Sequence, residues 1–220
     1  KAEFHNDLLA SSILNAALRG NLDRIMSTLD ANEDLLSSES EIGDTVLHNA
    51  VLSGNETVVR YLVWDRHMSP NSCNAFLSMP LLYLTCTGSL SIATCLLNCN
   101  GFVDPRDMMG RTPLMTACER GEEQLCQFLV DRDASTRSSD CREDTPLHIS
   151  TRFKQFECIR IILRRESTDC SAQNHMGDTA LHIACISRYH TISRALLEDG
   201  ADPQMKNRMG KKPIDCISSN

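Results

Sequence analysis

Apolar residues recur along this chain in pairs of short clusters that have helical spacing. The second cluster of each pair is the clearer one, as in Val58-Val59-x-Tyr61-Leu62 and Leu125-Cys126-x-Phe128-Leu129. Spacings of three and four residues place these side chains on one face of a helix. A glycine, such as Gly54 or Gly121, separates the two clusters and suits a tight turn with positive φ. The pattern predicts two short helices joined by a turn, repeated several times.

A motif built from Thr, Pro, Leu and His opens each pair of clusters. Its fullest copy is Thr145-Pro146-Leu147-His148. Six copies begin at residues 45, 79, 112, 145, 179 and 212, so the steps are 33 or 34 residues. Thr suits the N-cap of a helix and Pro suits its first turn. Two short helices cannot bury their apolar faces alone, whereas stacked neighbours can, so the period predicts an all-α solenoid.

The same period divides the chain into repeat units. One further step back from residue 45 reaches Ser12-Ile13-Leu14-Asn15, which adds a unit at the start. We expect a single domain over residues 1–220, with units near 8–41, 42–75, 76–108, 109–141, 142–175, 176–208 and 209–220. The seventh unit is too short for a second helix. Because the chain begins at Lys1 rather than Met, we expect it to be a segment of a longer protein.

These motifs resemble the ankyrin repeat. The best matches are Gly177-Asp178-Thr179-Ala180-Leu181-His182 and Gly200-Ala201-Asp202, and the resemblance runs from about residue 8 to 216. It implies stacked helix–turn–helix units with short β-hairpin loops, whose tips and first helices form a concave face. It also implies that His48, His148 and His182 are structural residues that bridge neighbouring loops by hydrogen bonds.

Two features depart from the family pattern. Lys154 and Arg188 occupy positions where Gly is usual, and a left-handed conformation there would cost roughly 1–2 kcal/mol each. The anchor of the third unit is degenerate, since Met79-Pro80-Leu81-Leu82 lacks both Thr and His. These departures affect local stability rather than the fold.

Composition and charge narrow the class of protein. Apolar residues make up 41% of the chain, enough for a core, and no apolar run approaches the ~18 residues that span a bilayer. The net charge is −7: residues 1–110 hold 6 basic and 13 acidic residues, and residues 111–220 hold 16 of each. The excess of acidic residues in the first half argues against nucleic-acid binding. The lack of a long apolar run argues against membrane insertion. The eleven cysteines are odd in number and form no Cys-x-x-Cys pair, so we expect free thiols and a cytoplasmic or nuclear protein.

The sequence predicts no catalytic residue, no cofactor and no metal site, and it argues against a small-molecule ligand. Cys95 and Cys99 lie four apart on one helix, a spacing that two zinc ligands could use, but buried small apolar residues explain them better. A Cys118–His148 nucleophile pair would lack a third group to orient it. Trp64 with Tyr61 could form an aromatic ligand site, although packing in a second helix explains both.

The positions expected at the loop tips carry an unusual pattern. The residue three before each anchor is apolar in five of six units, where exposure is expected. These tip residues are Ile42, Phe76, Met109, Arg142, Met176 and Met209. The first helices add apolar residues and cations beside them, namely Leu52, Phe153, Ile186, Arg120, Arg152 and Arg188. Exposed apolar stripes mark partner sites, and methionines suit adaptable contacts.

We therefore predict a protein–protein interaction module, a scaffold or regulatory segment that binds another protein or peptide through this groove. The partner segment would carry apolar anchors and acidic groups. Covering of one hairpin by the next remains an alternative account of the apolar tips. Two other functions remain open: a docking or oligomerisation domain of an enzyme whose catalytic part lies outside this chain, and an IκB-like inhibitor of a transcription factor.

Overall fold

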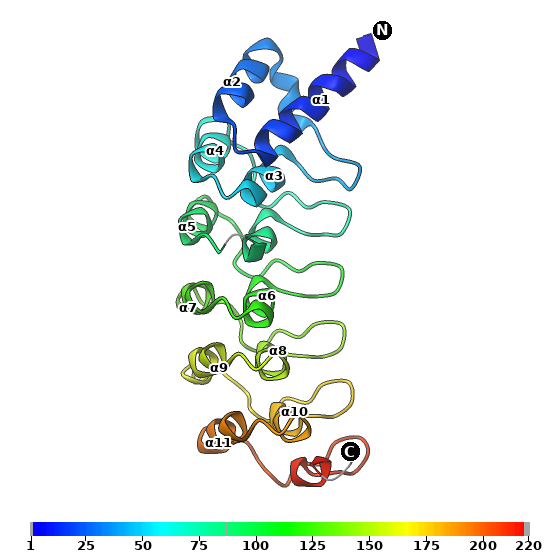
Figure 1. Cartoon of the computed structure of the whole chain (residues 1–220), viewed down its shortest axis with the longest axis vertical. Coiled ribbons are helices and arrows are strands. Elements are labelled where there is room, and N and C mark those ends of the chain that lie inside the picture. Colours follow the sequence, from blue (N-terminus) through cyan, green and yellow to red (C-terminus); the bar gives the residue numbers. More distant parts are fainter. Residues whose placement is uncertain (1, 87, 218–220) are drawn as a thin grey trace. The chain divides into compact units, whose positions relative to one another are not determined.

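The computed structural model describes residues 2–86 and 88–217, and side-chain surroundings are described for residues 8–84 and 88–217. The chain forms two compact units, Lys1–Met108 and Met109–Asn220, which are described separately. The division falls where the sequence period begins its fourth repeat. Within each unit the helices follow one another in pairs, as Figure 1 shows.

The first unit contains three helix pairs. Its elements are α1 (Ala2–Leu18), α2 (Leu22–Ala31), η1 (Glu33–Ser37), α3 (Val46–Ser53), α4 (Glu56–Arg60), η2 (Tyr61–Asp65), η3 (Pro80–Cys86) and α5 (Leu90–Asn98). Helix α3 packs between α1 and η3, and α4 packs against α5. Helix α1 begins at Ala2, so the first unit starts earlier than the boundary near residue 8 that the period predicts.

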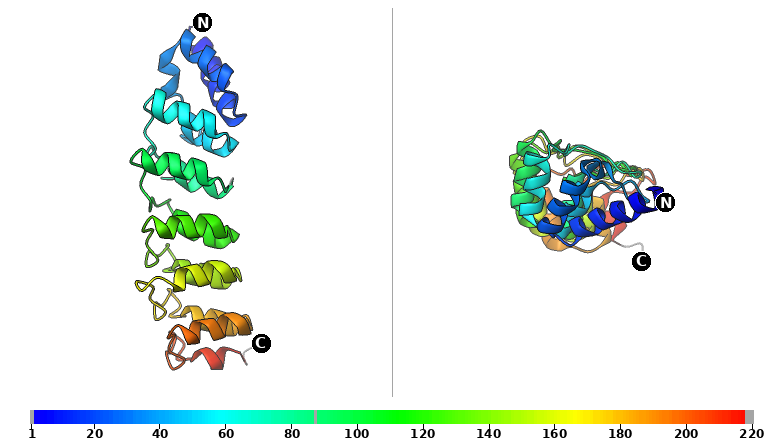
Figure 2. Two further views of the ribbon diagram at one scale, coloured as in Figure 1. Left: turned by 90° about the vertical axis from the view of Figure 1, so that its left-hand side faces the viewer. Right: turned by 90° about the horizontal axis from the view of Figure 1, so that it is seen from above.

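The second unit contains three complete pairs and the start of a fourth. Its elements are α6 (Pro113–Arg120), α7 (Glu123–Asp131), α8 (Pro146–Arg152), α9 (Phe156–Leu163), α10 (Ala180–Ile186), α11 (His190–Glu198) and η4 (Pro213–Cys216). Helix α8 packs against α6 and α10, and α10 packs against η4. Figure 2 shows these helices as successive layers, one layer for each repeat. The predicted all-α fold of stacked helix pairs is confirmed.

The anchor Thr caps the first helix in three of the repeats. The Thr45, Thr112 and Thr179 hydroxyls accept a hydrogen bond from the backbone N–H three residues on. This satisfies one of the unpaired donors at a helix start. In the degenerate third repeat, Met79 precedes a 3-10 helix, η3, rather than an α-helix. The loss of the anchor Thr therefore coincides with a tighter, less regular first helix.

The turn between paired helices uses the left-handed backbone conformation. Gly54 and Gly121 have φ of 70° and 73° there. Lys154 and Arg188 hold the same conformation with φ of 58° and 57°, so the substitutions of Gly leave the turn unchanged. Each side chain keeps the cost of roughly 1–2 kcal/mol that the sequence predicts for a non-glycine residue.

The loops between repeats contain turns in place of extended hairpins. Within the described residues they hold one isolated antiparallel bridge, between Glu39 and Thr45, and no regular strand. The β-hairpins implied by the family resemblance are thus reduced here to tight turns. Successive loops are instead joined by hydrogen bonds between their backbones.

Candidate functional site

The tip residues are paired through their backbones and exposed through their side chains. Five tip carbonyls accept the N–H of a residue in the next loop, in the pairs Ile42–Ala75, Phe76–Met108, Met109–Cys141, Arg142–His175 and Met176–Arg208. The N···O distances run from 2.8 to 3.1 Å. The apolar side chains remain between 43% and 67% exposed. Because this pairing uses only backbone atoms, it does not require an apolar side chain at the tip.

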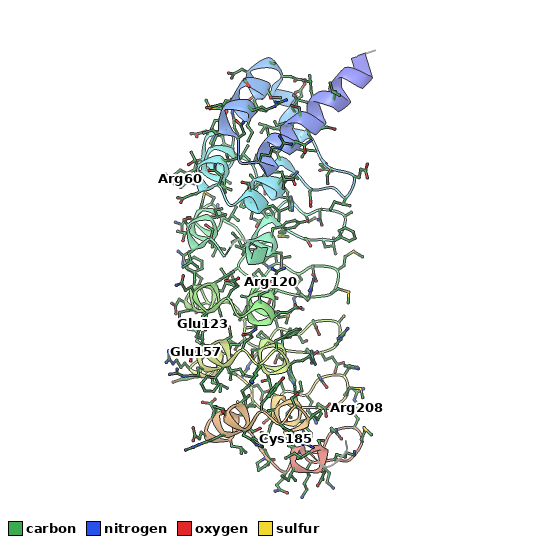
Figure 3. All side chains as sticks on the ribbon, viewed as in Figure 1. Arg60, Arg120, Glu123, Glu157, Cys185 and Arg208 are labelled. Atoms are coloured by element: carbon green, nitrogen blue, oxygen red, sulfur yellow. The ribbon has the colours of Figure 1, made fainter. Side chains whose placement is uncertain are left out.

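In the second unit the tips and first helices enclose a hollow of about 330 Å³. Met109 and Arg142 line it from the tips, and Ile149, Arg152 and Phe153 line it from α8 and its end. Four predicted site residues therefore meet in one place. Met176, Met209, Ile186, Arg120 and Arg188 are exposed but lie outside this lining, and Figure 3 labels Arg120 on α6.

Arg152 differs from the other predicted cations because its charge is already paired. Its two terminal nitrogens donate to the Asp144 carboxylate at 2.7 and 2.9 Å. Asp144 is buried, which opposes ionisation, but the hydrogen bonds from Arg152 and Asn174 lower its pKa. The hydrogen bond to Asp144 raises the pKa of Arg152. Arg152 thus holds the loop against α8 and is less suited to bind an acidic partner than Arg120 or Arg188.

A ladder of carboxylate–amide pairs supports the loops, and the sequence analysis missed it. The side-chain amide of an Asn donates to an Asp about 30 residues earlier in three pairs: Asn74–Asp44, Asn174–Asp144 and Asn207–Asp178. The Oδ1 of each Asn accepts two backbone N–H groups of its own tip. The sequence does contain a pattern that could have indicated this ladder. A Ser, Asp or Asn stands two residues before every tip position, at 40, 74, 107, 140, 174 and 207.

The anchor histidines bridge neighbouring loops, as the resemblance implies. Nδ1 of His48, His148 and His182 lies 2.8–2.9 Å from the hydroxyl of the capping Thr. Nε2 lies 3.0–3.1 Å from the carbonyls of Ser78, Asp178 and Lys211 in the next loop. Burial lowers the pKa of His48 and His148, so these two imidazoles stay neutral near pH 7. Because both ring nitrogens are hydrogen-bonded, neither has a free lone pair to bind a metal or to accept the proton of a nucleophile.

The first unit carries a smaller set of predicted residues. Ile42 and Phe76 are 43% and 50% exposed at their tips, whereas Leu52 on α3 is half-buried. The aromatic pair on η2 is occupied by cations of its own unit. The Arg60 guanidinium lies 4.3 Å from the Trp64 ring centre, and that of Arg66 lies 5.3 Å from the Tyr61 ring. These contacts favour packing over a ligand site.

The side chains of the cysteine pairs considered from the sequence have other contacts in the structure. Cys99 accepts a hydrogen bond from the Trp64 indole at 2.8 Å, and burial raises the pKa of neighbouring Cys95 to about 11. Both features suit structural thiols rather than zinc ligands. His148 is held by Thr145 and the Asp178 carbonyl, so it is not available as a base for Cys118. The structure instead places Cys118 beside Cys126 and Cys158.

Stacked helix pairs, histidine bridges and tip-to-tip backbone pairing define an ankyrin-repeat protein. The family's three-copy pattern matches residues 67–140 and 133–207, and its single-repeat pattern matches residues 42–75. The chain belongs to the ankyrin repeat family, whose repeat domains are non-catalytic modules that bind other proteins. The family assignment made from the sequence is confirmed.

Particular relatives share the repeats over about half of this chain or more. Mouse Inversin is 25% identical over 193 residues, which is 87% of this chain and 18% of Inversin. The human cation channel subunit Transient receptor potential A1 is 31% identical over 108 residues, 49% of this chain and 10% of the channel. The chain thus spans about a fifth or less of the length of these curated relatives.

Solved structures show the same fold. The ankyrin repeat domain of Bcl-3, described as a unique member of the IκB protein family, superposes with a TM-score of 0.83 at 22% identity, covering 93% of this chain and 92% of that domain. The human ASB11 ankyrin repeat domain gives 0.82 at 19% identity, covering 94% and 92%. At these identities the likeness concerns the fold alone. None of the described helices is long and apolar enough to cross a membrane.

Proposed function

We propose that this chain recognises a partner protein through the tip surface of its second unit. The tip surface comprises Met109, Arg142, Met176, Met209, Phe153 and Ile186. The partner would be a peptide segment or domain edge that places an apolar side chain into the hollow beside Met109 and Phe153. Ile42, Phe76 and Leu52 would give the first unit a comparable, smaller surface.

One observation carries the proposal, namely that the tips expose apolar side chains that their backbones do not need. Met109, Met176 and Met209 are 49%, 46% and 67% exposed. Exposed apolar area costs about 25 cal/mol per Å² relative to buried area, so a covering partner would gain that amount. Methionine is flexible and polarisable, which lets such a surface fit partners of different shape.

The cations around the tip surface favour acidic groups beside the apolar anchor. Arg120 and Arg188 are exposed and form no ion pair within the part of the chain that the structure describes. Arg152 is neutralised by Asp144, and Arg208 lies 3.8 Å from Glu143 across neighbouring tips, where Figure 3 labels it. We therefore expect acidic partner groups to contact Arg120 and Arg188 rather than Arg152.

The test is capture of partners by wild-type protein and by a Met109→Glu, Met176→Glu double variant. We expect the double variant to bind its captured partner more than about tenfold more weakly, because two anchors become charged. Leu197→Glu is the matched control, because Leu197 is 45% exposed on α11, away from the tips. Unchanged partner binding by a double variant with a wild-type circular dichroism spectrum would rule out the tip surface.

Two further functions are compatible with the same fold. The chain could be the docking or oligomerisation domain of an enzyme whose catalytic part lies elsewhere in a longer protein. It could also act as an IκB-like inhibitor of a transcription factor, which the likeness to Bcl-3 and the Gly43-Asp44-Thr45-Val46-Leu47-His48 motif support. Identification of the captured partner by mass spectrometry tests the second case, since the inhibitor function requires that partner to be a transcription factor.

A further inference from the structure

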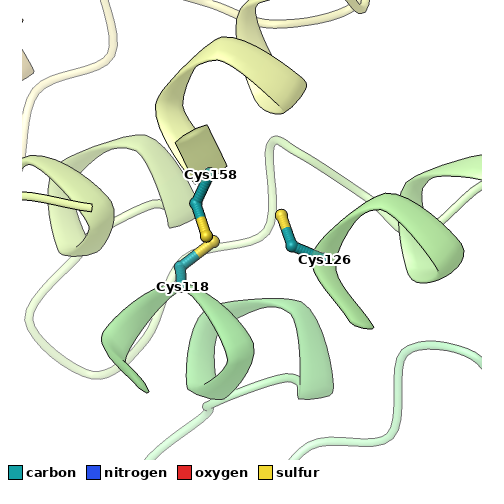
Figure 4. A group of neighbouring side chains, drawn as sticks. All are labelled: Cys118, Cys126 and Cys158. Atoms are coloured by element: carbon teal, nitrogen blue, oxygen red, sulfur yellow. The ribbon is translucent and has the colours of Figure 1, made fainter. Parts of the chain in front are cut away.

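Three cysteines from three helices meet inside the second unit, apart from the tip surface. Cys118 lies on α6, Cys126 on α7 and Cys158 on α9, and their sulfur atoms all lie within 4.8 Å of one another. Figure 4 shows the three side chains pointing toward one another. The cluster is 0% exposed at each residue. The residues are 8 and 32 positions apart, outside familiar ligand spacings, so only the packing of α6, α7 and α9 brings them together.

The spacing of the sulfur atoms suits a small thiophilic centre. Thiolate sulfurs bound at about 2.3 Å to one centre lie about 3.8 Å apart when the angles at the centre are tetrahedral, and about 3.5 Å apart when a pyramidal three-coordinate centre narrows them to about 100°. The three sulfurs, all within 4.8 Å of one another, need to approach one another by up to about 1.3 Å to reach the pyramidal geometry, which side-chain rotation can supply. The cluster has three members, and within the described residues it is the single group of three or more His, Cys, Asp or Glu side chains at such spacing.

Because the cluster is buried, the net charge of the complex determines which ion it can bind. Burial raises the pKa of the Cys118 thiol well above its usual value, because the thiolate is poorly solvated there. A buried complex is therefore most favourable when it carries no net charge. Three thiolates with Cu⁺ would keep two negative charges. With Zn²⁺ they would keep one, and structural zinc also requires a fourth ligand. A trivalent centre cancels all three charges and needs three ligands.

We propose that Cys118, Cys126 and Cys158 form a three-thiolate binding site for trivalent arsenic, taken up as arsenous acid. Each thiol loses its proton to one hydroxyl of As(OH)₃, each As–O bond is replaced by an As–S bond, and three waters leave. The oxidation state of arsenic does not change, so the reaction needs no oxidant or reductant. Neutral reactants give a neutral product, and the exchange neither releases nor takes up protons near pH 7.

Binding would join α6, α7 and α9 through one atom. Because the cluster is fully buried, arsenous acid reaches it only after local opening of these helices, so uptake should be slow and should raise the unfolding temperature. This site is independent of the tip surface, since the tip variants above leave all three cysteines in place.

The experiment uses the full 220-residue chain with Cys73→Ser and Cys141→Ser, which removes two exposed thiols. The protein is reduced with a phosphine, incubated with sodium arsenite, and analysed by native mass spectrometry and thermal unfolding. We expect one arsenic per chain, a mass gain of one arsenic minus three hydrogens, and a higher unfolding temperature. Loss of only two hydrogens, or no arsenic bound to the folded protein, would overturn the proposal.

Single Cys→Ala variants assign the ligands. Cys118→Ala, Cys126→Ala and Cys158→Ala should each bind arsenous acid at least about tenfold more weakly and lose the three-hydrogen signature. Cys185→Ala is the matched control, because Cys185 occupies the same repeat position as Cys118 but lies outside the cluster. If one variant fails to fold, the other two carry the test. Equal affinity in a folded cluster variant, or tight binding of zinc or Cu⁺ without arsenic, contradicts the assignment.

Discussion

Replacing Asp144 with Asn tests the ion pair that anchors a loop of the second unit. Asp144 is buried and accepts three hydrogen bonds, two from Arg152 at 2.7 and 2.9 Å and one from Asn174 at 2.9 Å. The asparagine keeps the size of the side chain but removes its charge. It also turns one acceptor oxygen into a donor that faces other donors.

The size of the loss follows from the burial of the two partners. Breaking a fully buried ion pair costs about 3–5 kcal/mol. The Arg152 side chain is 38% exposed, so water solvates its charge in part and reduces the cost. We expect Asp144→Asn to lower the free energy of unfolding by about 2–3 kcal/mol. Among the described residues, Asp44, the matching residue of the first unit, accepts from the neutral Asn74 and Tyr83 and from no cation. Asp44→Asn should therefore cost about 1 kcal/mol.

The assay is urea unfolding followed by far-ultraviolet circular dichroism. A double-mutant cycle with Arg152→Gln isolates the pair, and we expect a coupling energy above about 1 kcal/mol. The reasoning fails if the two substitutions are additive within about 0.3 kcal/mol, or if Asp144→Asn costs no more than Asp44→Asn.

Three further predictions concern the turns, the histidines and the thiols. Arg188→Gly should stabilise the protein by about 1 kcal/mol in urea unfolding, because it relieves a left-handed arginine at φ 57°, whereas Gly121→Ala should destabilise it by about 1 kcal/mol, because the alanine would have to adopt a φ of 73°. The free energy of unfolding should fall as the pH is lowered from about 7 to about 5. Burial lowers the pKa of His48 and His148 below the ordinary 6.5, so the unfolded chain binds more protons than the folded chain in that range. Urea midpoints against pH should flatten in a His48→Gln, His148→Gln variant, and an equally steep profile would exclude these groups. Thiol reagents should modify the exposed Cys73 and Cys141 of the folded protein quickly, and Cys118, Cys126 and Cys158 only slowly, through local opening; reaction of the buried three as fast as that of Cys73 would contradict the packing of α6, α7 and α9.

The repeat architecture could be predicted from the sequence because each repeat is a local unit. The N-cap Thr, the turn Gly and the helical apolar spacing all act within one stretch of about 33 residues, so they remain visible along the chain. The histidine bridges, which the family resemblance implies, are present in the structure, and Lys154 and Arg188 at the usual Gly positions adopt the left-handed conformation. For the site residues, the repeat period predicted which positions lie at the loop tips and on the first helices. Their role in binding remains a proposal.

The tertiary structure decided which side chains are paired and which are free to bind. The sequence predicts Arg152 as a cation of the binding groove. Its hydrogen bonds to Asp144 form because α8 packs against the loop that precedes it. The Asp–Asn ladder joins residues about 30 positions apart, and a single repeat gives no register between them. The meeting of Cys118, Cys126 and Cys158 has the same cause. Contacts between repeats depend on the distance and rotation of stacked helices, which packing sets and a one-dimensional period does not contain.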